Sequence, residues 1–353
     1  MLMIESERVM TYAEAVREAT EQEMARDPSV IVLGQGVDDP KAIYGTTKGL
    51  REAFGAERVF DTPLSEDGMM GVAIGAALAG LRPIHVHIRM EFLLLAMNQL
   101  VNMAAKCRYM YGGAVSVPLV IRVVIGRSWG QGPQHSQALH ALFCHIPGLK
   151  VIIPSTPYDA KGCLITSIRD NDPVVFIEHR LLHQRKGHVP SAPYALPLGR
   201  ARVLAAGTDV TLVGISYMAL ECLRARRCLE AVGIQAEVID PVSLTPLDME
   251  TIANSVWKTG HLIVADNAWL SCGASAEIIT RLMERAHGRK DFTVHRIGFE
   301  PVPCPTTKHL EQAFYTDASS VASFVYRLLR PEAHAWVPEA EPALEVVEFK
   351  GPF

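Results

Sequence analysis

The chain has 353 residues, of which 49% are hydrophobic and 20% charged, and this length predicts two domains rather than one compact core. Its net charge of −4, without a basic run, argues against a nucleic-acid partner, and no apolar stretch approaches the roughly 20 residues that span a bilayer. Seven widely spaced cysteines without a CxxC pair, and an N-terminal decapeptide without a signal-peptide pattern, indicate a cytoplasmic protein with reduced thiols.

The first half of the chain alternates helical and strand patterns. Thr11 is expected to cap a helix that continues to residue 26. Further helices are expected over 66–79, 94–106 and 157–169, and strands over 30–34, 83–88, 117–124, 150–154 and 173–178. Continuous apolar strands that alternate with helices are typical of a parallel sheet covered on both faces.

A proline-containing stretch without hydrophobic period, residues 185–199, is the expected linker between domains over 8–184 and 200–330. An extended tail is expected over 331–353. In the second domain, strands are predicted over 210–215, 235–240, 261–265 and 293–297, and helices over 218–232, 248–258 and 273–286. The predicted fold class is therefore α/β, with two doubly wound domains.

The segment from Phe60 to Gly68 places a carboxylate, Glu66, directly after a turn-rich stretch and before a helix rich in glycine and alanine. A carboxylate at the mouth of a tightly packed helix is poorly hydrated and has to be paired or hydrogen-bonded. An acidic residue in the first turn of a helix is also commonplace, because it interacts favourably with the helix dipole. Taken alone, the segment fits either interpretation.

Several motifs follow this segment in a fixed order: Leu81–Ile84, Gln134–Gln137, Pro147–Val151, Pro154–Gly162, Val238–Asp240 and Ser255–Gly260. Together with Asp61–Glu66, they resemble the β subunit of the thiamine-diphosphate-dependent first component of 2-oxoacid dehydrogenase complexes, in its pyruvate, acetoin and branched-chain forms. The resemblance covers roughly residues 8 to 330. It implies a transketolase-like pyrimidine-binding domain followed by a smaller transketolase C-terminal domain.

The resemblance implies roles for four residues. Glu66 matches the carboxylate that binds the pyrimidine ring nitrogen of thiamine diphosphate and favours the imino tautomer, whose nitrogen takes the proton of the thiazolium carbon. Phe92 matches an aromatic residue that packs on the aminopyrimidine ring, and Ile88 is expected to contact the cofactor. His135 matches a histidine that acts on the substrate and in acyl transfer. From the residues alone, Phe92 also fits a core aromatic and His135 a surface loop.

Two metal ions are expected, a monovalent cation on this chain and Mg²⁺ mainly on a partner subunit. The resemblance implies a site for a monovalent cation such as K⁺ at Ile168, Asp170 and Asp172, although a capping turn explains these residues equally well. The family holds Mg²⁺ with a Gly-Asp-Gly sequence followed by Asn, and Gly-Asp-Gly does not occur in this chain. A separate α subunit is therefore expected to hold Mg²⁺ and the diphosphate, in an α2β2 heterotetramer.

The chain departs from the family pattern in one stretch. The family usually has an acidic residue near position 86 and aromatic or small residues at 87–90, whereas this chain has His85, His87, Arg89 and Glu91. Arginine binds carboxylates and phosphates through two parallel hydrogen bonds, so a different substrate pocket is one explanation. Drift in a solvated loop is the other. The residues expected to line a substrate pocket are Arg89, Trp129 and Gln134, and Asn267 replaces an acidic residue of the second domain.

Three functions remain open at this point. The first is decarboxylation of a 2-oxoacid with acyl transfer to lipoamide, which would involve a lipoyl-bearing acyltransferase. The second is a split transketolase-like or acyloin-forming carboligase, which would act on a ketose or a 2-oxoacid. The third is a scaffold subunit without catalysis. The first two depend on Glu66 and thiamine diphosphate, whereas the third predicts that replacing Glu66 leaves activity unchanged.

Overall fold

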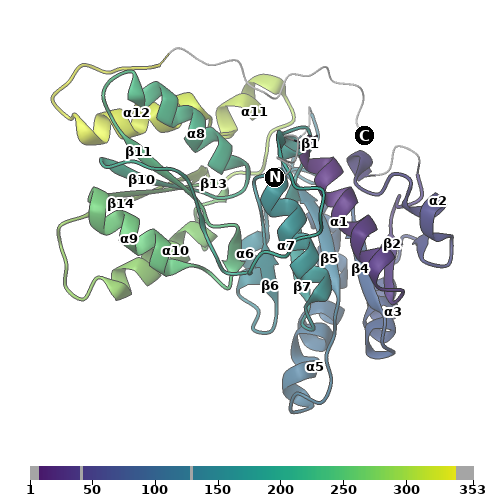
Figure 1. Cartoon of the computed structure of the whole chain (residues 1–353). Coiled ribbons are helices and arrows are strands. Elements are labelled where there is room, and N and C mark those ends of the chain that lie inside the picture. The colour runs from purple at the N-terminus through teal and green to yellow at the C-terminus, as the bar shows by residue number, and fades with distance from the viewer. Residues whose placement is uncertain (1–7, 40–42, 128–129, 339–353) are drawn as a thin grey trace, which may run out of the picture. The chain divides into compact units, whose positions relative to one another are not determined.

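A computed structural model describes residues 8–39, 43–127 and 130–338 and divides the chain into two compact units. The first unit comprises residues up to 125 together with 142–198 (Figure 1). The second unit comprises residues 126–141 together with the chain from 199 onward. Within the described ranges, each helix is too short or too polar to cross a membrane.

The first unit is built on a parallel sheet with the strand order β6-β7-β5-β4-β2-β3 (Figure 1). Its strands are β2 (Val30–Gly34), β3 (Val59–Asp61), β4 (Arg82–His87), β5 (Val120–Ile125), β6 (Lys150–Ile152) and β7 (Val174–His179). Most of their residues are buried, as expected for a parallel sheet with both faces covered. The predicted fold class is confirmed for this unit.

Helices cover this sheet, and short elements connect them. The α-helices are α1 (Tyr12–Arg26), α2 (Leu50–Phe54), α3 (Glu66–Leu78), α4 (Met90–Leu93), α5 (Ala105–Met110), α6 (His140–Cys144) and α7 (Pro157–Arg169). The 3₁₀ segments are η1 (Ile43–Gly45), η2 (Leu94–Ala96) and η4 (Arg180–Leu182), η3 (Gln99–Ala104) is π-helical, and β1 (Val9–Thr11) pairs with β8 (Lys186–His188). The helix predicted over 94–106 is therefore divided into η2, η3 and α5.

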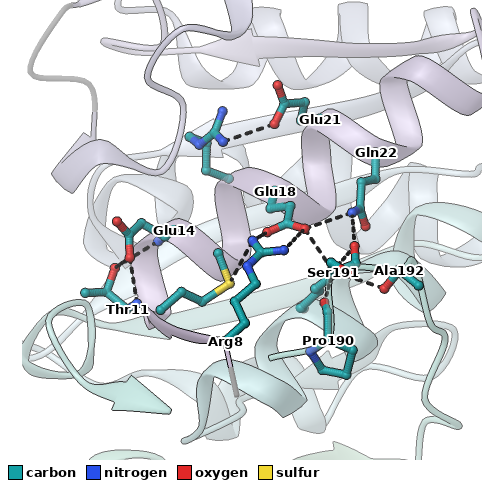
Figure 2. Close-up of polar contacts among 12 residues, drawn as sticks. Arg8, Thr11, Glu14, Glu18, Glu21, Gln22, Pro190, Ser191 and Ala192 are labelled. Carbon is teal, nitrogen blue, oxygen red and sulfur yellow. Dashed lines mark hydrogen bonds and ion pairs between the residues drawn. The ribbon is translucent and has the colours of Figure 1, made fainter. Parts of the chain in front are cut away.

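The first helix begins where its sequence predicts. Thr11 accepts a hydrogen bond from the Glu14 backbone N–H at 3.2 Å, and Glu14 accepts one from the Thr11 backbone N–H at 2.7 Å (Figure 2). This reciprocal capping box satisfies two backbone donors that the first turn leaves open.

A buried polar network joins α1 to α7 and to the stretch predicted as a linker. Lys161, fully buried on α7, donates to Glu18 of α1 at 3.1 Å and to the backbone carbonyls of Pro190, Ser191 and Ala192 at 2.7–3.2 Å. Figure 2 shows Glu18 between this segment and Arg8, with which it also forms an ion pair. Residues 190–192, within the predicted linker, thus bond to both α1 and α7.

The second unit contains a sheet with the strand order β14-β13-β10-β11-β9, in which only β9 is antiparallel to its neighbour (Figure 1). The strands are β9 (Arg202–Ala205), β10 (Val210–Gly214), β11 (Ala236–Asp240), β13 (His261–Trp269) and β14 (Thr293–Phe299), with β12 (Ser243–Thr245) outside this sheet. The helices are α8 (Tyr217–Glu230), α9 (Met249–Thr259), α10 (Ala274–Arg285), α11 (Lys308–Phe314) and α12 (Ala318–Leu329). The predicted strands and helices over 210–297 are confirmed, and α11 and α12 were not predicted.

The start of the predicted tail is ordered against this second unit. Trp336 packs on Tyr326 of α12, with ring centroids 5.0 Å apart, and joins the hydrophobic cluster formed by α8, α12, β10 and β11. Residues 339–353 lie outside the described part of the chain.

Candidate functional site

The carboxyl edge of the first unit's sheet carries a group of polar side chains. Gln35 follows β2, Glu66 follows β3, Arg89 follows β4 and Arg180 follows β7. Because these strands are parallel, their carboxyl ends lie at the same edge of the sheet, which is where open α/β sheets bind ligands. All three residues predicted to contact the cofactor, Glu66, Ile88 and Phe92, follow strands at this edge as well.

Glu66 is held at the first position of α3. Its Oε1 atom accepts a hydrogen bond of 3.0 Å from Gln35 Nε2, while the carboxylate as a whole is half-buried. Gln35 reaches this position because Gly34 lets β2 run tightly beside β4: a Cβ at Gly34, where φ is +149°, would lie 2.2 Å from the Val86 carbonyl oxygen. Among the described residues, Oε2 of Glu66 makes no hydrogen bond, so it is available to a ligand.

Two neighbouring histidines on β4 are buried next to Glu66. His85 and His87 point to the same face of the strand, and their ring centroids are 4.3 Å apart. Burial lowers the pKa of His87 from 6.5 to about 4. Burial and the adjacent His87 lower the pKa of His85 well below 6.5, and the nearby Glu66 carboxylate opposes that shift. Both rings are therefore neutral at pH 7.

These two rings leave polar atoms unused. Both ring nitrogens of His87 and Nδ1 of His85 are buried without a hydrogen-bond partner in the part of the chain that the structure describes. Buried polar atoms are nearly always hydrogen-bonded, and exceptions call for an explanation. A polar ligand at this edge would supply one.

A fully buried ion pair supports the sheet beneath this edge. Arg122 Nε of β5 lies 2.7 Å from Glu178 Oε1 of β7, and His183 Nε2 lies 3.1 Å from Glu178 Oε2. Burial would raise the pKa of Glu178, but Arg122 and His183 outweigh it and lower that pKa to about 2. The carboxylate thus stays charged and fixes the neighbouring strands β5 and β7.

Three more predicted residues, Ile88, Arg89 and Phe92, follow β4 at the same edge. Ile88 and Phe92 are half-buried, and Arg89 is only 4% exposed. Ile88 lies against Gly36, where an added Cβ would meet its Cδ1 at 3.6 Å. The combination of a carboxylate with an open oxygen, unpartnered imidazole nitrogens and apolar side chains fits an aminopyrimidine ring, which needs both polar partners and an apolar face.

His135 lies in a segment that belongs to the second unit. The segment is fixed by three contacts on either side of His135: Arg127 stacks on Tyr315 at 4.3 Å, Tyr315 Oη donates to the Ser136 carbonyl at 3.4 Å, and His140 Nε2 lies 2.9 Å from Asp266 Oδ2. His135 itself is half-buried, and Gln134 is exposed. Trp129 lies outside the described residues.

The turn predicted to bind a monovalent cation lies at the opposite, amino edge of the first sheet. Arg82 Nη1 donates to the carbonyl oxygens of Ile168 and Asp170, both at 2.9 Å. Lys150 Nζ lies 2.6 Å from the Asp170 carboxylate and 3.3 Å from that of Asp172. Because cationic side chains already use these oxygens, the donor set does not fit a potassium ion as it is arranged here. The potassium site stays a prediction from the sequence.

Three features of these sites were not predicted. Gln35 and Arg180 each follow a strand of a parallel sheet directly, and that position is itself a signal for ligand contact. The pair of His140 and Asp266 carries no such signal, because 126 residues separate its members. Among the described residues, no group of three or more His, Cys, Asp or Glu side chains is arranged to hold a metal ion.

Comparisons with known proteins agree with this arrangement. Residues 8–185 match the transketolase pyrimidine binding domain family, and residues 199–321 match the transketolase C-terminal domain family. A solved structure described as a split gene transketolase, an inactive beta4 tetramer, superposes with a TM-score of 0.74 at 24% identity, over 91% of this chain and 98% of that one. At this level of identity, the similarity shows a shared fold and nothing about function.

Curated relatives are more similar in sequence. The acetoin:2,6-dichlorophenolindophenol oxidoreductase subunit beta of Cupriavidus necator is 42% identical over 91% of this chain and 97% of its own length. The subunit of the same name from Bacillus subtilis is 39% identical over 91% and 98%. The pyruvate dehydrogenase E1 component subunit beta of Gracilaria tenuistipitata is 43% identical over 85% and 93%.

Proposed function

The chain belongs to the transketolase-like family of dehydrogenase β subunits, and we propose that it is the β subunit of a thiamine-diphosphate-dependent enzyme that decarboxylates a 2-oxoacid and transfers the acyl group to lipoamide. The observation that carries this proposal is the position of Glu66, at the carboxyl edge of the sheet, fixed by Gln35 and next to two neutral histidines.

Different residues at this edge would make the polar and the apolar contacts with the cofactor. When bound, thiamine diphosphate supplies the nucleophilic carbon and the electron sink. Glu66 would hold a proton between its carboxylate and the pyrimidine ring nitrogen, and Gln35 keeps the carboxylate oriented. Phe92 and Ile88 would provide the apolar contact. His85 and His87 are neutral, so they offer hydrogen bonds without adding a positive charge beside Glu66.

His135 is proposed to act on the substrate. A catalytic group on a loop has to be held by a rigid scaffold. Here the scaffold is the set of contacts made by Ser136 with Tyr315 and by His140 with Asp266, close to His135 on its C-terminal side. We expect replacement of His135 to impair turnover more than cofactor affinity.

The partner proposed for this chain is an α subunit, in an α2β2 heterotetramer that holds Mg²⁺ and the diphosphate largely on the α side. This follows from the relatives, which are named as β subunits, and from the chain's lack of a Gly-Asp-Gly sequence. A lipoyl-bearing acyltransferase is the proposed acyl acceptor, and the cytoplasm is the proposed location.

A carboligase that joins two carbon units is a second candidate. It is favoured by one observation, the polar and charged side chains of His85, His87 and Arg89 at positions that follow a different pattern in the family. Both candidates use Glu66, so the same variant tests the cofactor chemistry of each, and the acceptor substrate separates them.

The test uses the chain co-expressed with a candidate α subunit. Glu66→Gln should lower turnover by about three orders of magnitude while leaving assembly intact, because the amide cannot exchange a proton with the ring nitrogen. Asp67→Asn is the matched control, since Asp67 is the adjacent, exposed carboxylate on the same helix, and it should retain activity. Unchanged turnover in Glu66→Gln would instead support a scaffold role.

Calorimetric titration with thiamine diphosphate and Mg²⁺ complements the kinetic test. We expect binding by the α–β pair and none by either chain alone. Tight binding by this chain alone would contradict the shared site.

A further inference from the structure

Two arginines lie at the carboxyl edge of the first sheet. Arg89 lies two residues beyond β4, and Arg180 directly follows β7. In the sheet order β6-β7-β5-β4, the strands that carry them are separated only by β5. Burial lowers the pKa of Arg180, Tyr44 opposes that shift, and the charge of Arg89 adds to it.

Neither arginine has the partner that a buried charge normally requires. Arg89 is 4% exposed, and Nη1 of Arg89 and Nη1 of Arg180 are both buried without a hydrogen-bond partner among the described residues. No carboxylate pairs with either of them in the part of the chain that the structure describes. A buried, unpaired charge is costly, and two like charges side by side are more so. An anion between them would relieve both costs.

The surroundings hold Arg180 in place without neutralising it. The ring of Tyr44 lies 4.8 Å from the Arg180 guanidinium and 4.9 Å from the His183 ring. Glu178, the buried carboxylate two residues before Arg180, is already bound by Arg122 and His183. The guanidinium is therefore oriented by Tyr44, which stacks on it and hydrogen-bonds to it but carries no compensating charge.

The chemistry of decarboxylation restricts which anion this site should take. A carboxylate that leaves as CO₂ loses its charge in the transition state, so two arginines bound to it would stabilise the ground state and slow the reaction. The same arginines bound to an anionic group elsewhere in the molecule would contribute equally to both states and select the substrate without that loss.

From these observations we propose that Arg89 and Arg180 bind a second anionic group of the substrate, a carboxylate or phosphate remote from the reacting carbonyl. This proposal rests on the proposed function, because it assigns the substrate of the same site. It predicts an acyl or ketol donor with an acidic end rather than a donor with an apolar chain.

The experiment compares ligands that differ only in the remote anion. Binding of 2-oxoglutarate is measured against 2-oxopentanoate, and binding of ribose 5-phosphate against ribose, by calorimetry on the full-length chain and on its pair with the α subunit. The variants are Arg89→Met and Arg180→Met. Arg108→Met is the matched control, because Arg108 is an exposed arginine of the same unit that pairs with Asp172, before the amino end of β7.

We expect at least one anionic ligand to bind at least tenfold more tightly than its neutral partner. Each of the two variants should remove that preference, and Arg108→Met should keep it. Preference for 2-oxoglutarate identifies a carboxylate, and preference for ribose 5-phosphate identifies a phosphate. Equal binding within both ligand pairs, or a preference that survives in both variants, would overturn the proposal. So would a preference shown by the chain alone and lost in the pair, because a carboxylate of the partner would then occupy the site.

This readout is independent of turnover. A chain that binds the anion but shows no thiamine-dependent activity would support the anion site and contradict the proposed function. A chain that is active on apolar 2-oxoacids and shows no anion preference would support the proposed function and contradict the anion site.

Discussion

Two regions of the first unit bury ionisable side chains in opposite ways. Between α1 and α7, Lys161 and Glu18 are bonded to each other, and Lys161 also binds three backbone carbonyls. At the carboxyl edge of the sheet, Arg89 and His87 are as deeply buried and leave polar atoms without partners. Groups that are bonded, as Lys161 and Glu18 are, stabilise the architecture, whereas unpartnered polar atoms at the carboxyl edge of a parallel sheet are candidates for ligand contact.

The largest difference is expected from the paired region. Lys161→Met should lower the free energy of unfolding by about 2–4 kcal/mol, because Glu18 and the carbonyls near 190 lose a buried donor. Urea unfolding measures this change, and hydrogen exchange of residues 189–196 should accelerate. Lys106→Met is the control: Lys106 donates to a single carbonyl, that of Pro147, at the surface, and a loss below about 1 kcal/mol is expected. Equal losses of unfolding free energy in Lys161→Met and Lys106→Met would show that the buried contacts of Lys161 add no special stability.

The histidines at the sheet edge should make stability depend on pH. The folded pKa of His87 is about 4 and the unfolded value is 6.5, so between these values the unfolded state binds more protons and stability falls as the pH falls. The full shift corresponds to about 3 kcal/mol, lost between pH 6.5 and 4. His87→Phe should flatten this part of the stability curve, as measured by urea unfolding at several pH values. A curve as steep as that of the parent chain would show that His87 does not remain neutral.

Arg89 provides the smallest and most diagnostic change in stability. Arg89→Met should leave the free energy of unfolding unchanged or raise it by about 1–2 kcal/mol, since the substitution removes an unpaired buried charge. Its measurement beside Lys161→Met compares two buried cations with the same replacement. A loss of more than about 2 kcal/mol would mean that Arg89 is a structural residue, and the two regions would no longer differ.

Local signals in the sequence predicted much of the fold. Thr11 and Glu14 have the spacing of a capping box, and the strands of both sheets are short apolar runs, so each of these elements is decided by neighbouring residues. The stretch 94–106 was predicted as one helix and is instead divided by the π-helical η3, because the apolar pattern of a sequence does not distinguish these helix types.

The site was predictable only in part. Glu66 was predicted from its motif and the family resemblance, and the structure places it at the carboxyl edge of the first sheet. Arg180 was missed although it directly follows a strand, and its relation to Arg89 and Tyr44 is not visible in the sequence because these residues are distant along the chain. The bond between His140 and Asp266 depends likewise on tertiary structure. Pairings of this kind are set by the topology of the sheet and not by local sequence.

The segment 126–141 belongs to the second unit although both of its neighbours in sequence belong to the first, so the chain passes between the units at 125/126, 141/142 and 198/199. During synthesis, this segment emerges well before Asp266 and Tyr315, the residues that hold it. The segment around His135 can therefore form these contacts only after most of the second unit has been translated. A gene cut near residue 198 would yield a first half in which this segment lacks both contacts.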